Sequence, residues 1–189
     1  MSKQAILEAL KSSAMDPVAM PTIDIAPVTT DLKAYLAQSL ATVAGRLEEG
    51  GIDALNARVE ELMAGGNKVL SNLKEVPGNH KGADDPHDLA DVDFAVIKGE
   101  FAVAENGAVW VAETALNQRI APFICENLLL VVEKDAIVAN MHEAMTRLGK
   151  LDASLGFGVF IAGPSKTADI EQALVVGAHG ACSLSLYLV

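Results

Sequence analysis

Short runs of apolar residues recur along the chain, separated by amphipathic stretches or turns. The runs that predict strands cover residues 68–71, 93–97, 101–104, 108–112, 128–132, 157–162 and 183–188. Helical spacing of apolar residues predicts helices over residues 31–38, 53–63, 135–148 and 167–176. Residues 42–47 fit either a first strand or the end of the preceding helix. This alternation predicts an α/β fold, with a mostly parallel open sheet flanked by helices.

One pair of predicted strands is expected to form a β-hairpin inserted into this fold. Glu105, Asn106 and Gly107 lie between two apolar runs, and Asn-Gly at such a place is a strong hairpin signal. We expect a type I′ turn, in which Asn106 and Gly107 supply positive φ and Glu105 is solvated.

The first 28 residues differ from the rest of the chain. Ser2 is placed to cap a short amphipathic helix over residues 2–12. Three prolines within residues 15–28 then predict an extended arm, because proline fixes φ and removes a backbone donor. We therefore expect an N-terminal helix and arm (residues 1–28) and a single α/β domain (residues 29–189). The arm is either a strap over the domain surface or a segment that docks on a partner subunit.

Charge and hydropathy exclude several classes of protein. The formal net charge is −11, from 25 acidic and 14 basic residues, whereas nucleic acids and anionic membranes are bound by Lys/Arg-rich faces. The first 11 residues have no signal-peptide apolar region, and no stretch of membrane-spanning length is free of charge. These features predict a cytoplasmic protein.

The sequence carries no recognisable motif for a cofactor. Cys125 and Cys182 have no CxxC partner and no histidine at ligand spacing, so they predict neither an iron–sulfur cluster nor structural zinc. The GxGxxG pattern of dinucleotide-binding folds is also missing from the sequence. We therefore expect no metal, flavin, nicotinamide or iron–sulfur cofactor.

The most informative candidate for a ligand site is the segment of residues 163–167, here called the Gly163 turn. It is predicted to leave the carboxyl end of a strand and to open a helix, where free amides and the helix dipole favour an anion. Ser165 and Thr167 would add hydroxyl donors and Lys166 a positive charge. Alternatively, Ser165 or Thr167 is only the N-cap, and Asp169 complements the helix dipole.

The Gly163 turn also carries a family resemblance. The run Gly163-Pro164-Ser165-Lys166-Thr167-Ala168-Asp169-Ile170-Glu171, then Gly177-Ala178-His179-Gly180 and a final strand, resembles the C-terminal signature of the LUD domain family. The similarity is to the lactate-utilization protein C (LutC/YkgG) type, and it covers residues 91–189 well and the first half in outline. It implies the NagB/RpiA/CoA-transferase-like fold.

The resemblance implies a function. Family members act beside partners that carry iron–sulfur clusters. The chain would thus be a subunit of a system that oxidises L-lactate to pyruvate, without a redox cofactor of its own. It would bind a small anionic ligand, the iron–sulfur partners, or both, and a homo-oligomer stays open. The candidate ligand-binding residues are Asn106, Gly107, Gly163, Pro164, Ser165, Lys166, Thr167, Asp169, Glu171 and Gly180.

Two residues are candidates for catalysis. Related CoA-transferases place a catalytic glutamate in a similar turn, so Glu105 is a candidate nucleophile toward an acyl thioester. His179 is a candidate for proton transfer near neutral pH. The alternative function is thus an independent enzyme of the CoA-transferase or sugar-phosphate-isomerase type, acting on a CoA-linked or phosphorylated small molecule. A third hypothesis is an interaction module without activity.

We expect the Gly163 turn, the hairpin turn at residues 105–107 and the turn at residues 177–180 to converge at one end of the sheet. A final strand antiparallel to its neighbours would bring His179 to that site, whereas a parallel one leaves the His-Gly turn structural.

Overall fold

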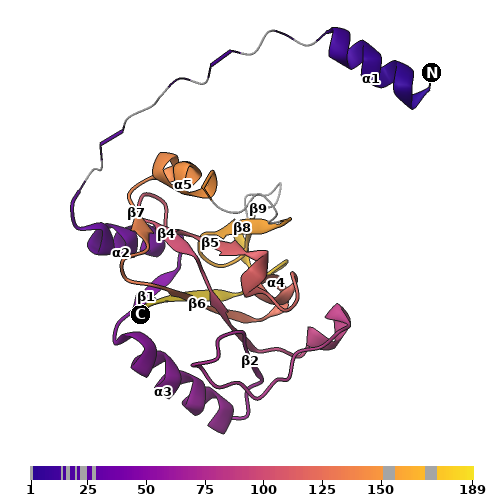
Figure 1. The fold of residues 1–189 in the computed structure, drawn as a ribbon. Helices are drawn as coiled ribbons and strands as arrows, with labels where there is room; N and C mark the ends of the chain where they lie inside the picture. Colours follow the sequence, from indigo (N-terminus) through magenta and orange to yellow (C-terminus); the bar gives the residue numbers. More distant parts are fainter. Residues whose placement is uncertain are drawn as a thin grey trace.

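The computed structural model of the 189-residue chain describes residues 2–13, 15, 18–19, 21, 25–26, 29–150, 156–168 and 174–189 (Figure 1). The predicted N-terminal helix is confirmed as α1 (Lys3–Ser12), and the Ser2 side chain accepts a hydrogen bond from the Ala5 N–H at 3.2 Å. No residue of α1 is buried, and the helix lies away from the rest of the protein in Figure 1. Much of the predicted arm lies outside the described residues.

A five-stranded parallel sheet forms the centre of the protein. Its strands are β1 (Arg46–Glu48), β11 (Ser183–Leu188), β6 (Asn127–Val132), β3 (Phe94–Lys98) and β2 (Val69–Ser71), in that order. Every pair of neighbours in this sheet runs parallel. The middle strand, β6, is apolar on both faces and buried from Leu128 to Val132. The predicted α/β fold with a mostly parallel sheet is confirmed.

A second, four-stranded sheet packs against the first. It contains β7 (Ile137–Val138), β4 (Phe101–Val103), β5 (Ala108–Ala112) and β8 (Gly158–Ile161), in that order. The hairpin of β4 and β5 is confirmed, but its turn is not of type I′. Val103 pairs with Ala108, so the turn has four residues, and Gly107 (φ 71°) has positive φ whereas Asn106 does not.

The two faces of the parallel sheet are covered differently. One face packs against the four-stranded sheet and α2 (Leu32–Thr42) around a core that includes Leu40, Leu130 and Leu186. The opposite face is covered by α3 (Gly51–Ala64), which buries Leu55, Val59 and Leu62 against it (Figure 1). The shorter helices are η1 (Pro86–Leu89), η2 (Glu113–Ala115), α4 (Ala121–Ile124) and α5 (Met141–Leu148). No helix among the described residues is both long enough and apolar enough to cross a membrane.

Two helices begin elsewhere than predicted. The helix predicted over residues 31–38 has Asp31 as its N-cap, so α2 begins at Leu32, and it extends to Thr42 before β1 begins at Arg46. The predicted helix over residues 135–148 is wrong in its first half, because residues 137 and 138 form β7 and pair in parallel with β4. The helical part begins only after Asn140, whose side chain accepts the Glu143 N–H at 3.0 Å as an N-cap.

The predicted helix over residues 167–176 is also wrong. Lys166–Ala168 forms β9 and Leu174–Val176 forms β10, and these two strands pair antiparallel. Residues 169–173, which include Asp169 and Glu171, lie outside the described residues. The Gly163 turn therefore leads into a strand and not into a helix N-terminus.

Candidate functional site

Two of the predicted turns lie directly against one another. The Ser165 N–H donates to the Ala181 carbonyl at 2.8 Å, and the Gly177 N–H donates to the Ser165 carbonyl at 2.9 Å. The Gly163 turn therefore packs on residues 177–180, here called the Gly177 turn. A Cβ at Gly180 would lie 3.2 Å from that of Ser165, so a side chain there would crowd the Gly163 turn.

Both turns lie at the amino-terminal edge of the parallel sheet. β11 runs parallel to β1 and β6, so the Gly177 turn before it lies where those strands begin. The Cys182 N–H, next to β11, donates to the Glu126 carbonyl next to β6 at 2.7 Å. We expected the Gly163 turn at the carboxyl edge, but β8 belongs to the second sheet and runs antiparallel to β5. β11 is parallel to its neighbours, so the antiparallel final strand that would bring His179 to the carboxyl edge is not present, and a role of His179 in proton transfer stays a prediction.

Gly163 and Lys166 both contact the end of α2. Gly163 is buried with φ 72°, and a Cβ there would lie 2.2 Å from the Val43 carbonyl oxygen. The Lys166 ammonium donates to that same oxygen at 2.7 Å. Val43 is the C-cap of α2, where the helix dipole favours a positive charge. In this structure the contacts of both residues thus hold α2 in place. That they and Pro164, Ser165, Thr167 and Gly180 bind a ligand stays a prediction.

Glu105 lies in the hairpin turn and contacts α5 and α2. Its Oε2 accepts a hydrogen bond from the Met141 N–H, in the first turn of α5, at 3.0 Å. Its backbone carbonyl accepts from Ser39 Oγ at 3.2 Å, and its N–H donates to the Ala139 carbonyl at 3.1 Å. Glu105 is therefore not merely solvated. Its carboxylate complements the amino end of α5, where the helix dipole favours negative charge.

The register of the second sheet places the hairpin turn near the Gly163 turn. Val109 pairs with Ile161, so Gly107 before β5 and Gly163 after β8 lie at the same end of that sheet. The side chain of Asn106 accepts the Ala108 N–H at 3.0 Å, which closes the hairpin turn locally. The two turns are thus neighbours, whereas the Glu105 carboxylate contacts α5.

We expect Glu105→Ala to lower the free energy of unfolding by about 1–2 kcal/mol, the scale for losing a helix-capping acceptor. Glu105→Gln keeps an oxygen acceptor for the Met141 N–H and should lose less. Urea denaturation of both variants measures the difference. Two variants as stable as wild type would show that the bond to α5 contributes nothing.

A groove of about 480 Å³ lies beside the Gly177 turn. Its charged lining is acidic, from Asp91, Asp93 and Glu126, and the exposed His179 and Cys182 also line it. Among the described residues, no three His, Cys, Asp or Glu side chains are grouped to hold a metal ion. Burial raises the pKa of the Cys125 thiol to about 12, so this thiol stays protonated at neutral pH.

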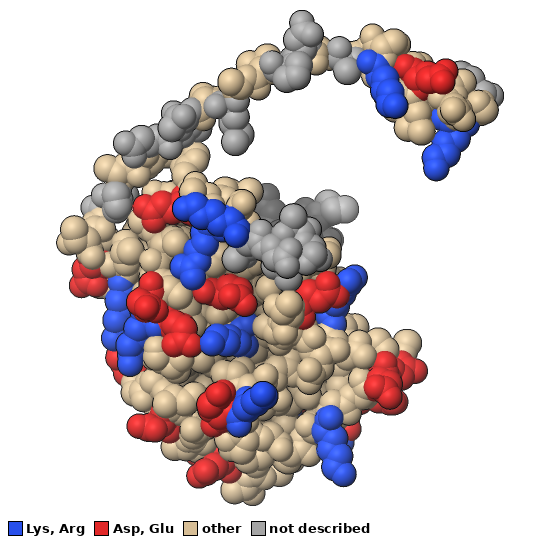
Figure 2. Space-filling view, in the orientation of Figure 1, with Lys and Arg blue, Asp and Glu red and all other residues tan. Residues whose placement is uncertain are grey.

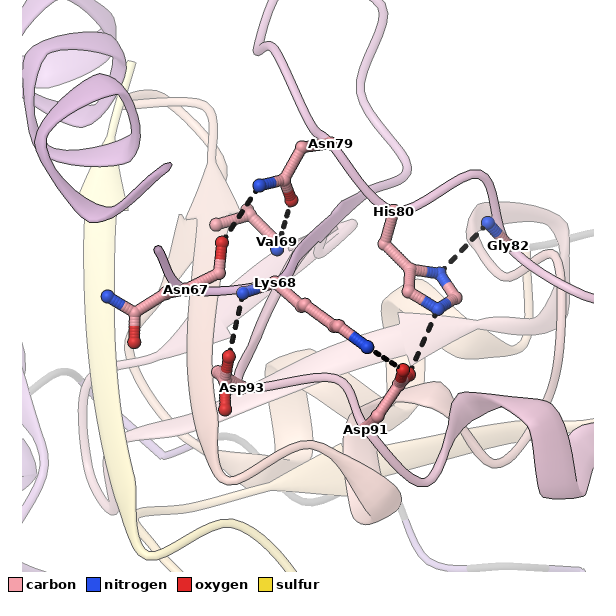
Figure 3. Close-up of polar contacts among 8 residues, drawn as sticks. All are labelled: Asn67, Lys68, Val69, Asn79, His80, Gly82, Asp91 and Asp93. Carbon is pink, nitrogen blue, oxygen red and sulfur yellow. Dashed lines mark hydrogen bonds and ion pairs between the residues drawn. The ribbon is translucent and has the colours of Figure 1, made fainter. Parts of the chain in front are cut away.

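A polar network holds the loop after β2 against this edge of the sheet (Figure 3). The Gly82 N–H donates to His80 Nδ1 at 3.1 Å, and His80 Nε2 lies 3.2 Å from Asp91 Oδ1. The Lys68 ammonium also contacts Asp91, and Asn79 bridges Asn67 and Val69 (Figure 3). Since Nδ1 is an acceptor here, Nε2 carries the proton and donates to Asp91. Both ring nitrogens are thus engaged within the protein, so the role of His80 is structural.

We expect Asp91→Asn to destabilise the protein at neutral pH but not in acid. The hydrogen bond from Lys68, together with the charge of its ammonium, holds the pKa of the Asp91 carboxyl below its ordinary value. A lowered folded-state pKa contributes stability above the unfolded-state pKa of about 3.9, and this contribution is lost as the pH falls through the folded value. Denaturation curves across acid pH test this, with exposed Asp88→Asn as the control. A gap between wild type and Asp91→Asn that persists in strong acid would contradict it.

A second groove, of about 430 Å³, lies on the face of the parallel sheet that α3 covers in part. We call it the sheet-face groove. Its polar lining is Arg46, Glu48, Arg58, Asn127, Ser183, Ser185 and Tyr187. Sequence reasoning missed these residues, although the alternation Ser183-Leu184-Ser185-Leu186-Tyr187 signals a strand with one hydroxyl-bearing face. Pro164 of the Gly163 turn and Cys182 also line this groove.

Comparison with known proteins identifies relatives of the chain. Lactate utilization protein C of Bacillus pumilus is 32% identical over 91 residues, which are 46% of this chain and 38% of that protein. The uncharacterized protein YkgG of Escherichia coli is 29% identical over 113 residues, 58% of this chain and 48% of that protein. The matched segments thus span less than half the length of these relatives.

A solved structure shares the fold. The crystal structure of a DUF162 family protein from Deinococcus radiodurans superposes with a TM-score of 0.58 at 15% sequence identity, covering 86% of this chain and 99% of that one. The model of the LUD domain family matches residues 4–189, nearly the whole chain. The chain therefore belongs to the LUD domain family.

Proposed function

We propose that the protein acts in the cytoplasm as a subunit of a lactate-utilization system that oxidises L-lactate to pyruvate. The observation that carries this proposal is the LUD family match over residues 4–189, together with relatives named lactate utilization protein C. The subunit has no redox cofactor of its own in this proposal. It binds a small anionic ligand, iron–sulfur partner proteins, or both.

The chemistry of the described residues is compatible with a non-redox subunit. The buried thiol of Cys125 is protonated, and the sequence has two cysteines, whereas an iron–sulfur cluster is held by four cysteine thiolates. Electron transfer is therefore assigned to partner proteins. The alternative, an enzyme of the CoA-transferase type with Glu105 as nucleophile, gains no support from the structure, since the Glu105 carboxylate is bonded to the Met141 N–H.

Deleting the gene in its host tests the proposal. We expect growth on L-lactate as the sole carbon source to be lost, growth on glucose to be unchanged, and the full-length chain supplied in trans to restore growth. The tagged chain should also co-purify with proteins that contain iron and acid-labile sulfide, and the complex should oxidise L-lactate. Normal growth of the deletion strain on L-lactate would overturn the proposed function.

A further inference from the structure

The sheet-face groove owes its shape to the incomplete cover that α3 provides. The apolar side chains of Leu55, Val59 and Leu62 on α3 pack against the part of the face that carries Val96 and Val131. Toward the amino ends of β1, β11 and β6, the same face carries polar side chains instead of apolar ones. These are Arg46, Ser183, Ser185 and Asn127. A sheet face built to be covered by a helix would be apolar there.

The walls of the sheet-face groove come from distant parts of the chain. Arg58 of α3 forms one side, and Pro164 and Val176 form another. Phe94 and Leu129 add apolar surface to the floor. A groove of 430 Å³ with an apolar floor and a few convergent polar groups has the size and composition of a small-molecule site.

The charge of the groove is opposite to that of the whole chain. Two arginines face one glutamate in it, whereas the chain has 25 acidic and 14 basic residues. The Glu48 carboxylate already accepts a hydrogen bond from Ser185 Oγ at 2.9 Å. Arg58 pairs with Glu61 at 2.6 Å. Arg46 is therefore the arginine of the groove that no ion pair among the described residues neutralises, and its charge favours an anion.

Arg46 is the group best placed to bind that anion. It is exposed on β1, and its guanidinium makes no hydrogen bond to any residue that the structure describes. Arg46 pairs in register with Ser185 on β11. Ser183 precedes Ser185 by two residues on that strand, so its hydroxyl lies on the same face of the sheet. A planar guanidinium beside a hydroxyl matches the geometry of a carboxylate or a phosphate. Burial, with Glu48 nearby, raises the pKa of Tyr187, which keeps its phenol protonated as a further donor.

We propose that the sheet-face groove binds a small metabolite that carries one carboxylate or phosphate group, held mainly by Arg46. Arg58 adds a positive charge that it shares with Glu61. The Ser183 hydroxyl donates to Asn127 Oδ1 at 2.6 Å and turns from it to hydrogen-bond the ligand, and Phe94 and Leu129 contact the apolar body of the ligand. This inference deepens the proposed function by locating a ligand site. It rests on the proposed function in the choice of L-lactate as one of the probes.

Calorimetric titration of the full chain tests the proposal. The probes are L-lactate, inorganic phosphate and phenyl phosphate, which separate carboxylate from phosphate recognition and measure what an apolar body adds. We expect saturable binding of at least one probe, and at least about tenfold weaker binding by Arg46→Gln, the usual effect of losing a charge-assisted contact. Arg119→Gln is the matched control, because Arg119 is an exposed arginine that pairs with Glu113.

Alkylation of Cys182 gives a second readout. Cys182 is exposed and lines the groove, whereas Cys125 is buried. A bound probe should slow alkylation of Cys182 in wild type and in Arg119→Gln, but not in Arg46→Gln at the same concentration. Ser183→Ala provides a second variant if the melting temperature of Arg46→Gln is lower than that of wild type.

Three results would overturn the proposal. They are no saturable binding of any probe, equal binding by wild type, Arg46→Gln and Ser183→Ala, and a stable dimer in solution that protects Cys182 without a probe. None of these results bears on growth on L-lactate or on co-purification with iron–sulfur proteins, so the proposed function is tested separately.

Discussion

Replacing Phe101 with alanine is expected to lower the free energy of unfolding by about 3–5 kcal/mol, the scale for removing a fully buried aromatic ring. Phe101 begins β4 and is completely buried. Its ring meets that of Phe160 edge-on at 6.1 Å, and the Arg147 guanidinium lies 4.9 Å from its centre. One side chain thus joins β4, β8 and α5. The loss would be a large part of the total stability of a domain of this size.

Phe123→Ala provides the matched control for this experiment. Phe123 lies on α4 and is 39% exposed, so its removal should cost about 1 kcal/mol or less. Urea denaturation, followed by circular dichroism, gives both values. If Phe101→Ala lost no more than Phe123→Ala, the four-stranded sheet would not be packed as described.

Gly163→Ala is expected to destabilise the protein by about 2–5 kcal/mol. An alanine there adopts the left-handed region, at about 1–2 kcal/mol, and its Cβ is forced against the Val43 carbonyl, at about 1–3 kcal/mol more. Because the clash is with backbone, no side-chain rotation can relieve it. The substitution should also displace Lys166 from the same carbonyl.

Gly66→Ala separates these two contributions. Gly66 also has positive φ, at 89°, but nothing lies within 4 Å of a Cβ at this position. Its substitution should therefore cost only the conformational part, about 1–2 kcal/mol. Equal losses for both variants would mean that the Gly163 turn does not press on α2. If the Gly163→Ala protein were as stable as wild type but no longer supported growth on L-lactate, a ligand-binding role for this glycine would be favoured instead.

The sequence predicted best the elements that stand out by composition. β6 and β3 were placed to within one residue because their apolar runs are long enough to be buried on both faces. The hairpin was found because Asn106 and Gly107 separate two such runs, although the turn type depended on a backbone angle that Asn106 does not adopt. The helix that became α3 was predicted because its apolar residues have helical spacing and Gly65 and Gly66 follow as a stop signal.

The errors concern segments in which pairing partners decide the structure. Ile137 fits a helical stripe with Met141 and Met145, yet residues 137 and 138 pair with β4, which lies far away in the sequence. Residues 167 and 175 likewise pair with each other as strands. Tertiary pairing outweighs helical spacing in segments of two or three residues, and a single sequence does not reveal the partner.

The candidate site depended on the same information. The anion site at residues 163–167 assumed a following helix, and the structure has β9 in its place. The sheet-face groove depends on the order of the strands, which brings Arg46 of the first strand beside Ser185 of the last. Such a neighbourhood follows from topology and not from any local motif.

The position of β11 between β1 and β6 also determines how the sheet can assemble. β1 pairs with β11 and with no other described strand, so its hydrogen bonds cannot form until β11 has paired. Bringing together segments so far apart in the chain carries a large loop-closure entropy, and contacts of this kind slow folding. β2, β3 and β6 are closer in sequence and form their ladder without it. In pulse-labelled hydrogen exchange, the amides of Arg46 to Glu48 should thus gain protection after those of β6 do.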